Sequence, residues 1–258
     1  MKNRLFKGIG FLLVLAVLCT VSAFADDTVR IGSAAELAAL GGKDFTGTLE
    51  LTQDIDMTGV AMQPITSFAG TFNGNGYTIK NLAITAEKRA YSSTTQGVAL
   101  FETFTGTARD LVFENPSITL TDGQMVGTAV LCGVVGEDGA TIENVGIVGG
   151  SISMESTKTT YAGGLVGDAE NTSLTVKNCF TEAKIAYTGS AKPKYNYFGG
   201  MLGYMMNVDL AFENCAVLGD VAAHTYSGIG YAGGFVGIIN GSNAGHTIDF
   251  TNCYFSGK

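Results

Sequence analysis

Few side chains in this sequence could act as acids, bases or metal ligands. The 258-residue chain has two histidines, His224 and His246. Neither has the spacing of a metal site or a catalytic triad, so we expect both to be solvated turn residues. Asp54 and Asp56 alternate on one strand face and could bind a cation, but we expect them to be solvated strand residues. No serine lies in a GxSxG motif. The sequence therefore predicts no catalytic residues, no metal site and no cofactor.

Tyrosines offer a different chemistry, because their rings can stack on sugar rings or on another protein. Four of them lie beside the longer loops and are candidate ligand-binding residues: Tyr187, Tyr195, Tyr204 and Tyr226. Three more occupy one position of a repeat, so we expect them to form a ladder that stabilises the stacking of coils. These are Tyr161, Tyr197 and Tyr231.

The repeat that carries these tyrosines defines the architecture. Its first signature is Tyr-x-Gly-Gly-x-x-Gly, at residues 161–167, 197–203 and 231–237. Its second is an acidic or amide residue between apolar ones, recurring roughly every 35 residues: Asn81, Asp110, Asn144, Asn178, Asn214 and Asn252. Glycine pairs, β-branched residues and short alternating segments favour strands over helices. The sequence predicts an all-β solenoid whose coils each contain three short strands.

The recurring Asn or Asp marks a corner of each coil. The inside-outside alternation of apolar residues breaks there, which indicates a change of direction. Asn adopts left-handed backbone angles more readily than other non-glycine residues. Stacked coils would align all six side chains in one structural ladder. Asn196 lies outside this phase, and we expect it in a loop.

Cysteines follow three of the ladder positions. Cys179, Cys215 and Cys253 should form one inward column, while Cys132 has another phase. Adjacent coils are about 4.8 Å apart, which is within disulfide reach. The column is therefore either a stack of buried thiols or contains one bridge, Cys179–Cys215 or Cys215–Cys253.

Residues 1–25 have the features of a secretory signal peptide, with a basic start, an apolar run and an Ala-Phe-Ala sequence. We expect cleavage after Ala25 and no membrane insertion afterwards. The leader holds three of the 15 basic residues and none of the 23 acidic ones, so the mature charge is 12 − 23 = −11. Such an acidic chain argues against nucleic-acid partners. The expected location is extracellular or the cell surface.

Two segments of the mature chain are predicted. Residues 26–48 form an N-terminal cap with a short helix, in which Ser33 is the N-cap, Glu36 completes a capping box and Gly41 ends the helix. Residues 49–258 form the solenoid. The sequence stops in mid-coil, so we expect either a continuation beyond it or a partner that shields the last coil.

The sequence resembles bacterial surface proteins with the GLUG repeat. Residues 51–56 and 68–82 are similar to the opening coils of such proteins, and Gly-Gly-Leu-Val-Gly at 163–167 is similar to the repeat itself. The resemblance covers about residues 30–258 and implies a right-handed parallel β-helix, often adhesin-like. Some relatives are attached to immunoglobulin-cleaving metallopeptidases, but this sequence has no HExxH motif. The repeat brings no catalytic residues.

These observations favour a non-catalytic secreted or cell-surface protein that serves adhesion or binds a ligand. Its expected partner is a glycan or a surface protein of a host or neighbouring cell. Two other classes remain open: a polysaccharide-degrading β-helix enzyme, and a structural stalk segment of a larger surface protein.

Overall fold

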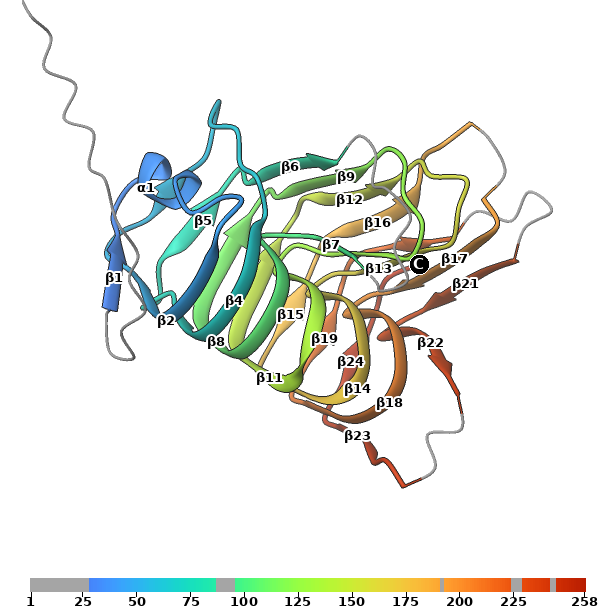
Figure 1. The fold of residues 1–258 in the computed structure, drawn as a ribbon. Coiled ribbons are helices and arrows are strands. Elements are labelled where there is room, and N and C mark those ends of the chain that lie inside the picture. Colours follow the sequence, from blue (N-terminus) through green and yellow to red (C-terminus); the bar gives the residue numbers. More distant parts are fainter. Residues whose placement is uncertain (1–27, 87–95, 191–192, 224–228, 242–244) are drawn as a thin grey trace, which may run out of the picture.

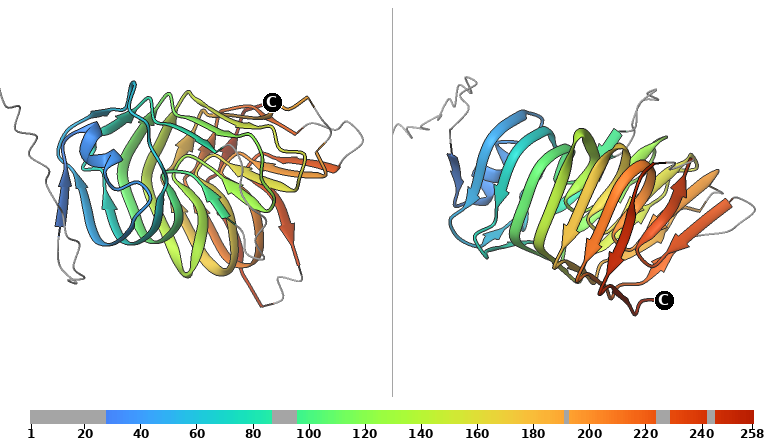
Figure 2. Two further views of the ribbon diagram at one scale, coloured as in Figure 1. Left: turned by 45° about the horizontal axis from the view of Figure 1, so that its top comes forward. Right: turned by 90° about the horizontal axis from the view of Figure 1, so that it is seen from below.

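The chain forms a stack of parallel coils (Figure 1). The structure is a computed structural model, and it describes residues 28–86, 96–190, 193–223, 229–241 and 245–258. Neighbouring coils pair through parallel strands in each of three sheets. The two further views in Figure 2 show the coils stacked along one axis. The predicted all-β solenoid, a parallel β-helix, is confirmed.

Within the described residues, the long sheet has 14 strands. They are β1 (Thr28–Ile31), β2 (Asp44–Leu51), β3 (Ile55–Asp56), β4 (Ile65–Asn73), β5 (Thr78–Lys80), β8 (Phe101–Glu114), β11 (Cys132–Val148), β14 (Val166–Lys177), β15 (Phe180–Thr181), β18 (Leu202–Glu213), β19 (Ala216–Val217), β22 (Val236–Asn240), β23 (Ile248–Thr251) and β24 (Tyr254–Phe255).

In the described part of the chain, two further sheets of five strands each complete the coils. The second sheet contains β6 (Ala83–Ala86), β9 (Ser117–Leu120), β12 (Ser151–Met154), β16 (Lys184–Tyr187) and β20 (Val221–Ala222). The third sheet contains β7 (Gln96–Val98), β10 (Val126–Thr128), β13 (Thr160–Gly163), β17 (Tyr195–Gly199) and β21 (Ile229–Gly233). A coil runs from the long sheet to the second, then the third, and back to the long sheet one rung further on.

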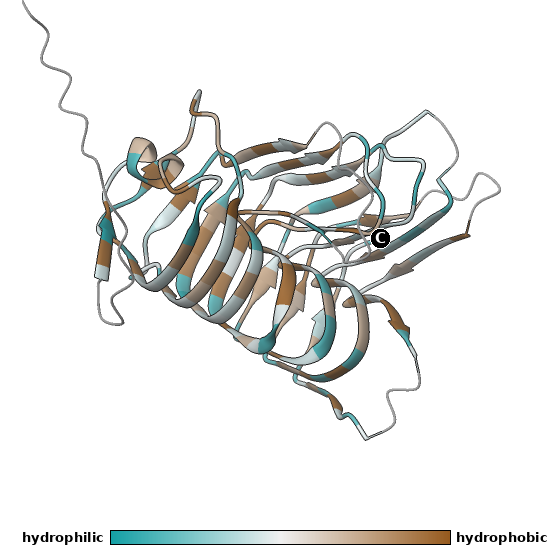
Figure 3. Cartoon of the chain, viewed as in Figure 1, coloured by the Kyte–Doolittle hydropathy of each residue, from teal (hydrophilic) through white to brown (hydrophobic). Residues whose placement is uncertain are grey.

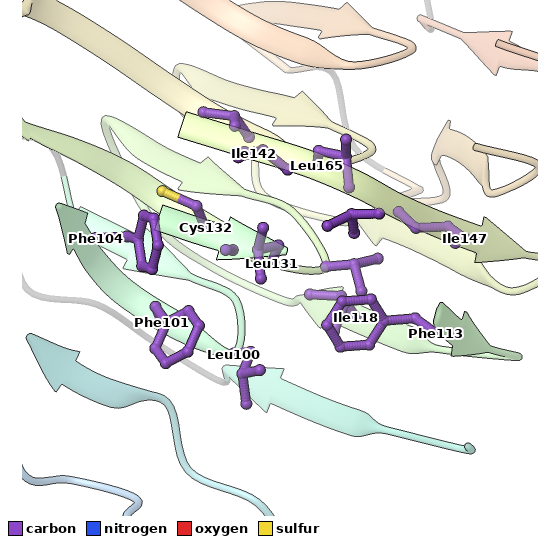
Figure 4. Close-up of a cluster of buried hydrophobic side chains, with 14 of the residues drawn as sticks. Leu100, Phe101, Phe104, Phe113, Ile118, Leu131, Cys132, Ile142, Ile147 and Leu165 are labelled. Atoms are coloured by element: carbon purple, nitrogen blue, oxygen red, sulfur yellow. The ribbon is translucent and has the colours of Figure 1, made fainter. Parts of the chain in front are cut away.

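The core fills the space enclosed by the three sheets, and apolar residues alternate with polar ones along the strands (Figure 3). Figure 4 shows the middle of this core, where Phe104, Ile118 and Leu131 come together from successive parts of one coil. Equivalent residues also stack between coils. The rings of Phe45 and Phe68 lie 5.3 Å apart and nearly parallel, as do those of Phe68 and Phe104. Each buried aromatic ring removes roughly 150–250 Å² from water, so these columns are a main source of stability.

The first coil is covered by α1 (Ala34–Ala38), and the predicted capping helix is confirmed. The Ser33 hydroxyl accepts a hydrogen bond from the Glu36 amide at 3.3 Å, and the Glu36 carboxylate accepts one from the Gly32 amide at 2.8 Å. This reciprocal arrangement satisfies amides that have no partner within the helix. Leu37 is completely buried against the core. The helix ends at Ala38, sooner than the position of Gly41 suggested.

An amide ladder runs along one corner of the solenoid. Its five residues have φ angles between 51° and 55°: Asp110, Asn144, Asn178, Asn214 and Asn252. Each amide group donates to the side chain one coil earlier, at 2.9 Å for Asn144 to Asp110 and at 3.1 Å for the next three pairs. The series ends on a carboxylate, which is a stronger acceptor than an amide. The ladder therefore fixes the left-handed corner of each coil to the same corner of its neighbours.

Asn81 does not belong to this ladder. It follows Lys80, whose register partner is Glu114, so it lies at a later corner than Asp110 does. Its amide donates instead to Asp56 at 2.9 Å and to Thr58 at 3.0 Å. The repeat spacing placed Asn81 wrongly, because the early coils use different residues at their corners.

Three other asparagines differ from the sequence interpretation. Asn171 and Asn207 form a second, shorter ladder at another left-handed corner, with a 3.1 Å hydrogen bond between their amides. Asn196, expected in a loop, is fully buried in β17 and accepts a hydrogen bond from Thr160 at 3.1 Å. Asn207 lies between apolar residues, Met205 and Val208, as the residues of the main ladder do.

The cysteine column consists of free thiols in this structure. Cys179 and Cys215 are buried, and Cys253 is half-buried in the last coil. The Val145 amide donates to the Cys179 sulfur at 3.4 Å. A hydrogen bond with Cys215, together with burial, raises the pKa of the Cys179 thiol. Cys132, also free and buried, lies in a different column.

Glycines of the repeat allow the third sheet to lie directly against the start of the long-sheet strands. A Cβ atom on Gly167 would lie 2.3 Å from the carbonyl carbon of Gly127, and one on Gly203 would lie 2.6 Å from the nitrogen of Ala162. These neighbours are backbone atoms, which cannot move aside as a side chain can. The last glycine of Gly-Gly-x-x-Gly is therefore required by contact between two backbones.

Replacing Asn178 with Ala should lower the free energy of unfolding by about 1–3 kcal/mol, because two ladder hydrogen bonds are lost and the corner stays left-handed. Asn178→Gly should lose the same bonds without the conformational strain and should fall between Asn178→Ala and the unmodified protein. Urea unfolding measures all three. Ser173→Ala, at an exposed position of the preceding strand β14, is the control; a loss as large as that of Asn178→Ala would show that the ladder carries no special energy.

Gly203→Ala should destabilise the protein by about 3 kcal/mol or more, because the added methyl group overlaps backbone on two coils. Gly59→Ala is the control, since Gly59 has a φ of 74° but a Cβ atom added there would have no neighbour within 4 Å. That substitution should cost only about 1–2 kcal/mol of conformational strain. The comparison separates close packing from backbone angle by thermal or urea unfolding; similar losses for both variants would contradict the packing argument.

Candidate functional site

Tyrosines from the third sheet form one row along the solenoid. Tyr161 of β13, Tyr197 of β17 and Tyr231 of β21 are register partners. Their ring centroids are 5.7 Å apart for the first pair and 5.4 Å for the second. Parallel pairing therefore places one ring above the next, at the spacing of the coils.

A tyrosine from the long sheet joins this row. Tyr204 of β18 stacks on Tyr161, with ring centroids 4.4 Å apart and planes inclined by 20°. It also lies 5.9 Å from Tyr197. The preceding residue is Gly203, whose missing side chain brings β18 against the third sheet. The Asn240 amide donates to the Tyr204 hydroxyl at 2.6 Å, which fixes that ring from the next coil.

Tyr195 extends the group outward. Its ring is nearly parallel to that of Tyr197, with centroids 6.2 Å apart, and the Lys194 ammonium lies 5.8 Å from its centre. We call the resulting five residues the tyrosine cluster: Tyr161, Tyr195, Tyr197, Tyr204 and Tyr231. Two of the four tyrosines proposed from the sequence for ligand binding, Tyr195 and Tyr204, thus join the row of ladder tyrosines through contacts with Tyr161 or Tyr197.

The other two candidates are elsewhere or are not described. Tyr187 lies in β16 of the second sheet, where it is buried and its hydroxyl donates to the Glu155 carbonyl at 3.3 Å. Tyr226 lies outside the described residues, as does His224.

The cluster has a buried base and an accessible outer part. Tyr161 and Tyr204 are 4% and 6% exposed, Tyr195 and Tyr197 are half-buried, and Tyr231 is 43% exposed. The rings therefore become more accessible from the middle of the solenoid toward its last coil. Only the outer three can contact a ligand without a change in the fold.

Two acidic residues adjoin the base of the cluster. Asp168 is fully buried and is the register partner of Tyr204, while Glu170 lies two residues further along β14. Burial and the nearby Asp168 carboxylate raise the pKa of Tyr161. Burial also raises the pKa of Tyr204 and of Glu170. The hydroxyl groups at the base thus stay protonated at neutral pH. Sequence reasoning missed both acids, since nothing in their spacing reveals the opposing sheet.

The remaining polar candidates make local structural contacts. Asp54 accepts from the Thr78 amide at 3.0 Å and pairs with Lys80 at 3.6 Å. Hydrogen bonds from Asn81 and Thr58 lower the pKa of Asp56 to about 2.

His246 has a similar local role, since its Nδ1 atom lies 3.5 Å from the Asp209 carboxylate. Within the described parts of the chain, no three His, Cys, Asp or Glu residues are placed to hold a metal ion. The same residues include no helix long and apolar enough to cross a membrane.

Sequence comparisons give one partial match. No protein-family model matches the chain. It is 33% identical over 111 residues to Halomucin from Haloquadratum walsbyi (strain DSM 16790 / HBSQ001), a match that takes in 42% of this chain and 1% of that protein. The chain thus spans a very small part of that relative.

A solved structure is similar over most of the solenoid. It is the crystal structure of "a putative immunoglobulin A1 protease" from Bacteroides ovatus, with a TM-score of 0.61 and 22% identity. The likeness covers 83% of this chain and 62% of that one. At this identity it supports the fold alone.

The buried tyrosines predict a loss of stability in alkali. The pKa of Tyr161 is raised on folding from about 10 in the unfolded chain, so its contribution is complete below pH 10 and is lost as the pH rises further. Above pH 10, the free energy of unfolding should therefore fall less steeply for Tyr161→Phe than for the unmodified protein, by up to about 1.4 kcal/mol per pH unit. Urea unfolding of both proteins at pH 8 to 11.5 measures the two slopes; identical slopes would contradict the burial of this hydroxyl.

Proposed function

We propose that this chain is a non-catalytic, exported β-helix that binds a glycan through the outer rings of the tyrosine cluster. The observation that carries the proposal is the meeting of Tyr195, Tyr197 and Tyr231 at one partly exposed place on a rigid support. A tyrosine ring offers an apolar face to the C–H groups of a sugar and a hydroxyl to its polar groups. Rings held by neighbouring coils lose little conformational entropy when a ligand binds.

The base of the cluster supports this role. Tyr161 and Tyr204 hold the outer rings from below, and Asn240 holds Tyr204 by its hydroxyl. If the tyrosines served only to stabilise the stacking of coils, Tyr161, Tyr197 and Tyr231 would be enough. The additional placement of Tyr195 beside Tyr197, with Lys194 over its ring, widens the accessible surface.

Charge favours an uncharged glycan as the ligand. The mature chain carries 23 acidic and 12 basic residues, and Asp168 and Glu170 adjoin the cluster. A polyanionic sugar would be repelled by this field. Neutral polysaccharides or neutral oligosaccharides on a surface protein are therefore the expected ligands.

Export and the absence of catalysis are parts of the same proposal. The leader at residues 1–25 has the composition of a cleaved signal, and the sequence resembles adhesin-like GLUG-repeat proteins. Asp54, Asp56 and His246 each make contacts that stabilise local structure. The low pKa of Asp56 makes it a poor proton donor, so it does not suit the general acid of a glycosidase.

A glycan array followed by calorimetric titration tests the proposal. Tyr197→Ala and Tyr231→Ala should each weaken binding of the selected glycan by roughly tenfold, which is about 1.4 kcal/mol. Tyr254→Ala is the matched control, because Tyr254 is 60% exposed in the last coil but lies outside the cluster. It should leave the affinity unchanged.

Three results would contradict the proposal. Failure to bind any glycan would favour a structural stalk. Equal loss in Tyr254→Ala would show that the cluster is not the site. Turnover of the bound glycan, abolished by one Asp or Glu substitution, would make the chain an enzyme.

A further inference from the structure

Two cysteines of the thiol column lie directly above one another in neighbouring coils. The backbone amide of Ala216 donates to the Cys179 carbonyl at 2.9 Å, and the side-chain amide of Asn214 donates to Asn178 at 3.1 Å. These bonds flank Cys179 and Cys215 on both sides along the chain, so the pair is held in register. Parallel coils are about 4.8 Å apart, and disulfides join residues whose Cα atoms are about 4.4–6.8 Å apart. The backbone therefore already has the spacing that a bridge needs.

The Cys215 sulfur points toward the coil of Cys179. Its Sγ atom lies 3.4 Å from the carbonyl oxygen of Val176, which belongs to that coil. A hydrogen bond between the two cysteine side chains lowers the pKa of Cys215 to about 7 and raises the pKa of Cys179. Two adjacent groups that share one proton behave in this way. The two sulfur atoms are thus close neighbours in the core.

The two other described cysteines do not compete equally for this contact. Cys132 belongs to a column in which the adjacent residues are apolar. Cys253 follows Cys215 in the thiol column, but burial is the main reason that its pKa is raised. The hydrogen bond between sulfur atoms therefore favours Cys179 over Cys253 as the partner of Cys215.

We propose that Cys179 and Cys215 form a disulfide when the chain folds in an oxidising environment. The form with two free thiols is then the reduced state of the protein. Both cysteines are 1% exposed in the folded chain. The exchange reaction consequently takes place before the coils close over the pair.

The oxidant is a small disulfide such as oxidised glutathione. The Cys215 thiol loses its proton to solvent, and the thiolate attacks one sulfur of the oxidant, which gives a mixed disulfide and one glutathione thiolate. The Cys179 thiol passes its proton to that thiolate. Its sulfur then attacks the Cys215 sulfur and displaces the second glutathione, which takes up a proton from solvent. The two cysteines thus lose two electrons and two protons, and one glutathione disulfide becomes two thiols.

The bridge links two coils that build the tyrosine cluster. Cys179 follows β14 in the coil of Tyr161, and Cys215 follows β18 in the coil of Tyr197 and Tyr204. The linked residues are 215 − 179 = 36 positions apart, and a cross-link over such a loop restricts the unfolded chain. The bridge therefore stabilises the part of the solenoid on which the outer rings rest.

Peptide mapping tests the bridge directly. The full chain is unfolded with a reductant, refolded in a mixture of oxidised and reduced glutathione, alkylated, and cleaved with trypsin without reduction. Cleavage after Lys177, Lys184 and Lys194 places Cys179 in residues 178–184 and Cys215 in residues 195–258. Mass spectrometry is expected to find these two peptides joined in most of the refolded chain. Refolding with dithiothreitol should leave them separate.

Serine variants assign the partner of Cys179. Cys253→Ser should retain the link between the two peptides. Cys215→Ser should abolish it, because Cys253 is two coils away from Cys179. Cys132→Ser is the matched control, since Cys132 is also a buried thiol but lies in another column, and it should keep the link.

Thermal unfolding of the unmodified chain gives a measurement that needs no variant. The chain refolded with glutathione should unfold at a temperature about 5–10 °C higher than the chain refolded with dithiothreitol. Together with the peptide map of the unmodified chain, this comparison decides the case if a serine variant fails to fold, as judged by circular dichroism.

Four results would overturn the proposal. They are the absence of a link after oxidative refolding, a link that persists in Cys215→Ser, a bridge within residues 195–258 that joins Cys215 to Cys253 instead, and equal unfolding temperatures in the two conditions. Glycan binding is measured separately, so its failure leaves this test unaffected.

Discussion

Backbone hydrogen bonding between parallel coils is the constraint on which the rest of this structure depends. Because each coil pairs with the next in register, a residue has as its neighbour the equivalent residue one coil away. A residue type that is required at a corner, in the core or at a close contact of one coil is therefore required at the same position of the following coils. The amide ladder, the stacked phenylalanines, the thiol column and the row of tyrosines are four results of this single condition.

The same condition explains why the repeat contains so much glycine. A coil must return from the third sheet to the long sheet within a few residues, and the two strands pass each other at backbone distance. Gly203 occupies such a crossing, where even a methyl group would meet the backbone of Ala162. This crossing also brings Tyr204 beside Tyr161. Close packing required by the fold thus creates the aromatic cluster that we propose as the binding surface.

Regular stacking has a cost at the two ends of the solenoid, where a coil lacks a neighbour on one side. At the N-terminal end, α1 covers the core with Leu37. At the C-terminal end, Phe250 repeats the position of the buried Phe212 but is 46% exposed.

The repeat, the all-β solenoid, the helix cap and the corner positions from Asp110 onward could be predicted from the sequence alone. These features are local or recur at a fixed phase, so residue type and spacing are enough to predict them. Sequence spacing misplaced Asn81 and Asn196, because their surroundings depend on how particular coils deviate from the repeat.

Which tyrosines come together became apparent only in the folded chain. Tyr204 belongs to a different sheet from Tyr161, and Asp168 reaches the cluster from a third strand. Such contacts depend on how closely two sheets pass each other. The backbone contact at the repeat glycines sets that distance, and it cannot be read from the order of residues along the chain.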